Sequence, residues 1–205
     1  MYNDLMNRFF KENKDESTTP GVAAIAHFNM RLASRPDVGD KAHSMMHELV
    51  FESAPHRKEE IMPGLEEINS ATTSEQLIKI MRRDMDIMNR PAFFSKAIQM
   101  ETEIIPEVVR RLKTNLISGF IEVAAELLVR TSINVSEEVI AYFDDMRSPY
   151  AQSLVLVMLG FKADEKHIPW FIEKYNKLKK TYPRENYHDG AYYGLCEMDM
   201  RFYPE

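Results

Sequence analysis

The chain has 205 residues, a formal net charge of −6, 14 methionines and a single cysteine, Cys196. A net negative chain lacks the clustered Lys and Arg that phosphate binding requires, so we do not expect a nucleic-acid binder. One cysteine excludes an internal disulfide, and with no apolar run of about 18 residues and no secretory leader we expect a cytoplasmic protein that does not span a membrane. The seven glycines, and ten prolines placed mostly at apparent helix boundaries, favour an all-α fold.

Residues 1–70 predict several helices without a regular spacing. The expected helices cover 2–14, 20–34, 40–53 and, kinked or divided at Pro63, 56–68, with a polar break at 14–19. In the third helix, the apolar stripe expected to face the core consists of Ala42, Met45, Met46 and Leu49. We interpret this region as degenerate repeats or as an N-terminal cap of one domain that comprises residues 1–205.

Residues 71–205 carry a more regular pattern. After two expected helices over 75–88 and 92–100, three segments begin alike at Ile105, Ser136 and Ile168, about 31 residues apart. Apolar residues recur in them at matched positions of one helical face, namely Val108, Val139 and Phe171, then Val109, Ile140 and Ile172, then Leu112, Phe143 and Tyr175. A second helical segment follows each of them, over 118–131, 148–161 and 189–202.

This series of paired helices resembles the HEAT-like family of α-solenoids over residues 89–205. The match is to a divergent member, because the Asp and Arg residues that often form a ladder between HEAT repeats do not recur regularly. The resemblance implies antiparallel helix pairs stacked as a right-handed solenoid. It also implies that the second helix of each pair lines a concave surface, and that the surface binds a partner.

Five residues on the second helices form the predicted binding patch. When these helices are aligned on their caps, Glu122 and Glu126 of the first fall on Tyr193 and Glu197 of the third, and the middle helix contributes Gln152. Residues four apart form a ridge along one side of a helix. The patch is predicted to bind a basic or hydrogen-bond-donating segment. The alternative is that the same side chains make intramolecular contacts between neighbouring repeats.

Two enzymatic alternatives stay open. His43 and His47, four residues apart on one helix and with His27 as a candidate third ligand, have the spacing of metal ligands, although surface or inter-helix histidines have it too. The HEAT resemblance also implies DNA glycosylases for alkylated bases. Their aromatic and acidic groups would correspond here to Trp170, Tyr192 and Tyr193 with Asp189 or Asp199.

We therefore expect a non-catalytic protein-interaction module without a cofactor, whose partner is a protein or peptide of basic character. The sequence pattern specifies neither the partner's identity nor the oligomeric state. Cys196 lies inside an expected helix and is interpreted as an inert packing thiol.

Overall fold

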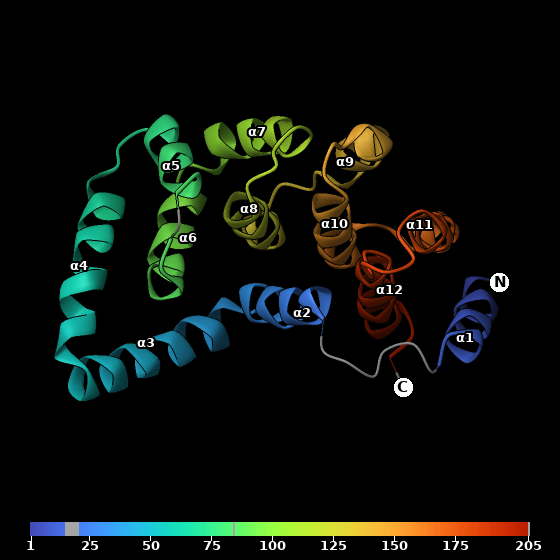
Figure 1. Ribbon diagram of the computed structural model, residues 1–205, viewed down its shortest axis with the longest axis horizontal. Coiled ribbons are helices and arrows are strands. Elements are labelled where there is room, and N and C mark those ends of the chain that lie inside the picture. Colours follow the sequence, from blue (N-terminus) through green and yellow to red (C-terminus); the bar gives the residue numbers. More distant parts are fainter. Residues whose placement is uncertain (15–20, 84, 205) are drawn as a thin grey trace. The chain divides into compact units, whose positions relative to one another are not determined.

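The computed structural model describes residues 1–14, 21–83 and 85–204, and every regular element in them is helical (Figure 1). The expected all-α class is therefore confirmed, whereas Pro20 and most of the polar break at 14–19 lie outside the described residues. No helix in the described ranges combines the length and the apolar character needed to cross a membrane. The α-helices are α1 Tyr2–Glu12, α2 Val22–Ala33, α3 Pro36–Ser53, α4 Pro55–Ser70, α5 Ser74–Met81, α6 Arg90–Ile98, α7 Glu101–Leu112, α8 Ser118–Arg130, α9 Ser136–Tyr142, α10 Pro149–Lys162, α11 Ile168–Thr181 and α12 Asp189–Phe202. The 3-10 turns are η1 Ile87–Asn89, η2 Phe143–Asp145 and η3 Glu165–His167.

The helices form two compact units, which we describe separately. The first unit comprises Met1–Met30 and Asn134–Glu205, and the second comprises Arg31–Ile133. The first unit thus contains α1, most of α2 and α9 to α12, and the second contains α3 to α8.

Helix boundaries differ from expectation at the end of α5, which ends at Met81 rather than at residue 88, and at several prolines. Helix α3 begins at Pro36 rather than at residue 40, because proline at the first helical position lacks only an N–H that would be unpaired anyway. Helix α4 continues through Pro63, and α7 begins at Glu101 and contains Pro106. Two acidic residues in the first turn of α7, Glu101 and Glu103, complement the helix dipole and favour that earlier start.

In the first unit, the core forms where α10 and α12 pack closely. Helix α10 is buried along most of its length and α12 along one side, and α11 packs against α12 while α1 packs against α11. Between α1 and α11, the Phe9 and Tyr175 rings meet edge to face with centroids 4.9 Å apart, and the Tyr175 hydroxyl donates to Asn13 Oδ1 at 3.0 Å. These contacts attach the N-terminal helix to the unit.

In the second unit, helices follow one another in two layers. Helix α5 packs against α7, α6 packs against α8, and the two layers meet where α7 packs against α8. The central helix α8 is buried nearly all round, from Phe120 to Val129, as its almost uniformly apolar sequence predicts. Helices α3 and α4 extend this unit, with α4 packing against α6.

The expected core stripe of α3 is wrong. Met45, Met46 and Leu49 are 58%, 51% and 64% exposed, and the side chain of Ala42 is outside the described set. The opposite face of the helix contacts the unit instead, through polar groups. Asp40 accepts a hydrogen bond from Arg130 Nη2 at 2.8 Å, and the imidazoles of His43 and His47 meet backbone carbonyl groups. These specific polar contacts, rather than apolar burial, orient α3.

We predict that Glu107 on α7 makes the free energy of unfolding depend on pH in the acidic range. Hydrogen bonds from Arg110 and then Arg111 lower the pKa of Glu107 from 4.5 to about 2. A carboxyl whose pKa is depressed by folding contributes stability above its unfolded pKa, and that contribution disappears as the pH falls from about 4.5 towards 2. The stability lost in Glu107→Gln, measured by urea unfolding, should therefore be largest at neutral pH and vanish near pH 2. A loss of stability in Glu107→Gln that stays constant from about pH 7 to about pH 2 would contradict the prediction.

Candidate functional site

The two acidic residues predicted on α8 are both held by Arg90 of α6. Arg90 Nη1 donates to Glu126 Oε1 at 2.6 Å and Nη2 donates to Glu122 Oε2 at 3.0 Å. The side chains of Arg90 and Glu126 are 12% and 9% exposed, whereas Glu122 keeps 35%. Burial raises the pKa of Glu126, and the positive charge of Arg90 opposes that rise. In the second unit, these carboxylates therefore link α8 to α6.

The predicted residues on α12 also have partners within their own unit. Nε2 of His27, on α2, lies 3.0 Å from Glu197 Oε2, and both side chains are nearly buried. The ring of Tyr193 lies beside the same imidazole, with centroids 5.4 Å apart. His27 is thus engaged by a carboxylate and an aromatic ring.

The five patch residues divide between the two units, two in the second and three in the first. Their joint arrangement on one concave face stays a prediction. What the sequence did not reveal is the pair of basic partners, Arg90 and His27. Arg90 lies 32 and 36 residues from its carboxylates and His27 lies 170 residues from Glu197, so no helical spacing links them.

The imidazoles of His43 and His47 lie against the backbone of η1. Their Nε2 atoms are 3.3 Å from the carbonyl oxygen of Ile87 and 2.7 Å from that of Met88, so each Nε2–H donates to a carbonyl. Among the described residues, no group of three or more His, Cys, Asp or Glu side chains is arranged to hold a metal ion. The observed contacts are those of inter-helix histidines.

The aromatic residues of the glycosylase alternative pack in separate clusters. Trp170 meets Phe143 and Phe171 edge to face, whereas Tyr192 packs on Phe9 and Phe10 of α1. Burial raises the pKa of Cys196 to about 12, so the thiol is not poised as a nucleophile at neutral pH.

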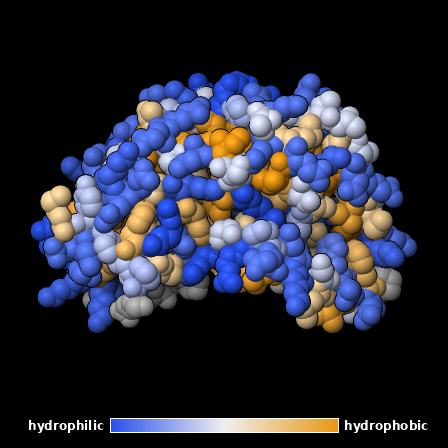
Figure 2. Space-filling model, turned by 180° about the vertical axis from the view of Figure 1, so that it is seen from behind, coloured by the Kyte–Doolittle hydropathy of each residue, from blue (hydrophilic) through white to orange (hydrophobic). Residues whose placement is uncertain are grey.

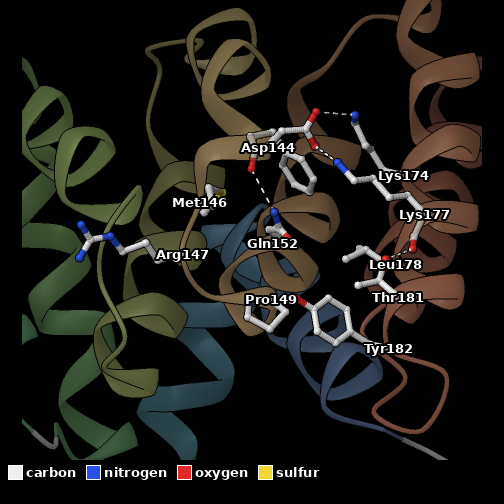
Figure 3. Close-up of a pocket in the computed structure, with 11 residues that line it drawn as sticks. Asp144, Met146, Arg147, Pro149, Gln152, Lys174, Lys177, Leu178, Thr181 and Tyr182 are labelled. Atoms are coloured by element: carbon white, nitrogen blue, oxygen red, sulfur yellow. Dashed lines mark hydrogen bonds and ion pairs between the residues drawn. The ribbon is translucent and has the colours of Figure 1, made fainter.

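Gln152 lines a different site, a cavity of about 210 Å³ in the first unit (Figure 3). It lies between η2, the first turns of α10 and the second half of α11. Its apolar wall consists of Phe143, Met146, Pro149 and Leu178. Gln152 Nε2 donates to the carbonyl oxygen of Phe143 at 3.2 Å, which fixes the amide at the cavity wall.

The polar wall is built on Asp144, which lies between two lysines of α11 (Figure 3). Lys174 Nζ donates to Asp144 Oδ2 and to Glu173 Oε1, and Lys177 Nζ donates to Asp144 Oδ1, each at 2.9 Å. Arg147 also lines the cavity, but its guanidinium points away from the lysines (Figure 3).

Burial alone would raise the pKa of Asp144 and lower that of Lys174, because it disfavours both charged forms. The hydrogen bonds and opposite charges of the cluster outweigh burial in both cases. They lower the pKa of the carboxyl and raise the pKa of the ammonium group. Asp144 and Lys174 are therefore both charged at neutral pH.

Comparisons with protein-family models, with curated proteins and with solved structures found no match.

What the cavity can bind follows from its own chemistry. Lys174 is 5% exposed and directs two of its three N–H groups to carboxylates, whereas Lys177 is 55% exposed and shares a single carboxylate with it. The exposed ammonium of Lys177 is thus the group best placed to meet a ligand at the cavity mouth, beside an apolar wall.

Proposed function

We propose that the protein is a non-catalytic interaction module, built of HEAT-like helix pairs, that holds a segment of a partner protein in the cavity beside Lys177. The contacts of α5 with α7 and of α6 with α8 support the repeat assignment. Stacked repeats bring together the first helices of neighbouring pairs, and likewise the second helices. In the first unit, α10 packs against α12 in the same way, because both are the second helices of their pairs.

The observation that carries the proposal is the cavity itself. At about 210 Å³ it is smaller than the roughly 300–1,000 Å³ of typical small-molecule and cofactor sites. A cavity of this size suits one anchoring side chain from a larger partner, and such anchors in pockets dominate the affinity of many interfaces.

One face of the molecule offers a partner little continuous apolar area. On the face drawn in Figure 2, hydrophobic groups occur in small patches within a mostly hydrophilic surface. A partner that binds this kind of surface gains more from a filled pocket with a charged contact than from broad apolar contact.

The cavity selects the chemistry of the segment. Lys177 is exposed and shares its single carboxylate, Asp144, with Lys174, so an acidic group is favoured beside its ammonium at the mouth. The apolar wall favours a neighbouring aliphatic or aromatic side chain. We therefore propose a segment that pairs Asp or Glu with an apolar anchor, which is opposite in charge to the basic segment that the carboxylate patch predicts. The carboxylates Glu126 and Glu197 are already held by Arg90 and His27.

We predict that reversing the charge of Lys177 removes this binding. Peptides of matched length, with either Glu or Lys beside Leu or Phe, would be titrated into the full-length protein and followed by fluorescence anisotropy. The acidic set should bind the wild type, and Lys177→Glu should weaken binding at least about tenfold, because it replaces an attraction at the mouth with a repulsion.

The matched control is Lys180→Glu, which makes the same charge change at another exposed lysine of α11 that does not line the cavity. It should change affinity less than about twofold, an effect of long-range charge only. Equal losses in the two variants would assign the effect to net charge, and failure of every acidic peptide to bind the wild type would overturn the proposal.

A further inference from the structure

Helix α3 presents an apolar stripe to solvent. Val38, Met45 and Leu49 are 41%, 58% and 64% exposed, and we call these three residues the α3 seam. Their spacings of seven and four residues place them within about 40° of one another around the helix, as the d, d and a positions of a heptad. Met46, 51% exposed, widens the stripe on one side.

The α3 seam is turned away from the helices that hold α3 in place. The residues that contact the second unit, Asp40, His43 and His47, lie on the opposite side of the helix, about 140–200° from Val38. The seam is therefore a second face of α3, available while the first face keeps its own contacts.

Two opposite charges flank the α3 seam on one edge. Lys41 and Glu48 are seven residues apart, occupy the same heptad position g, and are both exposed. Neither has a hydrogen bond or ion pair with any part of the chain that the structure describes. A partner helix that brought the reverse order of charges would satisfy both.

We propose that the α3 seam is the interface of a homodimer, in which α3 of one copy packs antiparallel on α3 of a second copy. In an antiparallel heptad pair, a positions face d positions and g positions face g positions. Setting Val38 opposite Leu49 of the second copy places Lys41 opposite Glu48 of the second copy. Twofold symmetry makes each of these contacts occur twice.

The charges select this orientation over the parallel one. A parallel pair would bring g positions to e positions, where Lys41 would face Met46 of the second copy and Glu48 would face Ser53, without an opposite charge. The dimer uses other residues than the cavity beside Lys177, and in the other unit, so either proposal can fail while the other holds.

The interface is small, because the α3 seam spans about 16 Å of helix. Interfaces below about 1,200 Å² form weak, reversible complexes, and we expect a dissociation constant on the order of 10–100 µM. Sedimentation velocity of the full chain from 5 to 500 µM, a range chosen to bracket that value, should therefore show a concentration-dependent monomer–dimer equilibrium.

A charge exchange tests the register. Lys41→Glu makes both flanking positions acidic and Glu48→Lys makes both basic, so each variant alone should dimerise at least about tenfold more weakly than the wild type. An equimolar mixture of the two variants should form a heterodimer, because every acidic position then meets a basic one. The difference should shrink in 1 M NaCl, where the screening length is about 3 Å.

Leu49→Gln tests the apolar contact separately. It keeps helix propensity and alters an exposed side chain, so thermal melting at 5 µM, below the expected dissociation constant, should match the wild type while dimerisation weakens about tenfold or more. The proposal would be overturned if the wild type stayed monomeric up to 500 µM, the upper end of the range chosen above. It would also be overturned if the mixture of charge variants dimerised no more strongly than each variant alone, or if Leu49→Gln left dimerisation unchanged. A monomer that co-sediments with phosphatidylcholine vesicles through the α3 seam would overturn it as well, because the occupant would then be lipid.

Discussion

Replacing Gly194 of α12 with alanine is expected to destabilise the first unit by about 1–3 kcal/mol. A Cβ at this position would lie 2.4 Å from the carbonyl oxygen of Leu156 and 2.6 Å from Cε1 of Phe171. The nearer neighbour is the backbone of α10, which cannot turn aside as the end of a flexible side chain can. The gain in helix propensity, up to about 1 kcal/mol, does not offset the separation of two packed helices.

The same close approach extends along the helix pair. A Cβ at Gly190 would lie 2.0 Å from the carbonyl oxygen of Ser153, and one at Gly160 would lie 2.5 Å from that of Gly194. These three glycines let the backbones of α10 and α12 touch, so Gly190→Ala should be at least as damaging as Gly194→Ala.

The control for both changes is Gly119→Ala in α8. There the nearest atom to an added Cβ is the carbonyl oxygen of Arg83 at 3.9 Å, an ordinary van der Waals distance. This variant should be neutral or more stable by up to about 1 kcal/mol. Urea unfolding followed by circular dichroism measures all three variants. A loss in Gly119→Ala as large as in Gly194→Ala would show that the effect is not helix contact.

Replacing Arg90 with methionine is expected to cost about 3–5 kcal/mol, the usual result of removing one partner of a buried ion pair. Glu126 would remain 9% exposed without its main cation, and burial already raises the pKa of this carboxyl. Glu122, at 35% exposed, can be solvated by water and contributes less to the loss. Because Glu126 can escape the penalty by taking up a proton, the loss should be smaller below pH 5 than at pH 7.

Two further variants isolate the buried charge as the cause. Arg90→Met combined with Glu126→Met removes both charges and should recover most of the stability, since apolar replacement of a whole buried pair is often nearly neutral. Arg110→Met removes a 68% exposed partner of Glu107 and should cost less than about 1 kcal/mol. If the double variant were no more stable than Arg90→Met alone, lost packing rather than an unpaired carboxylate would explain the cost.

The sequence predicted the helices best where burial alone determines the structure. Helix α12 runs from Asp189 to Phe202, as expected, and α10 is buried along most of its length, as its apolar sequence indicates. In such segments a hydrophobic period and a cap residue carry enough information to define the element.

Prediction failed where distant polar partners decide which face is buried. The contact of Asp40 with Arg130 joins residues 90 positions apart, so the Met-rich side of α3 looked like a core stripe from its spacing alone. The cavity was missed for the same reason, apart from Gln152. Asp144 and Lys174 are 30 residues apart and come together only after η2 and α11 have packed.

The most direct test of the proposed function is a methyl NMR titration of the full-length protein, labelled at its methionines, with an acidic peptide that carries an apolar anchor. Met146 lines the cavity, whereas Met45 and Met46 lie exposed on α3 and serve as internal references. We predict a saturable shift of the Met146 methyl signal, abolished in Lys177→Glu, with no change at Met45 or Met46 at constant protein concentration. Saturable shifts at other methionines while Met146 stays unchanged would contradict the proposal that this cavity binds the partner.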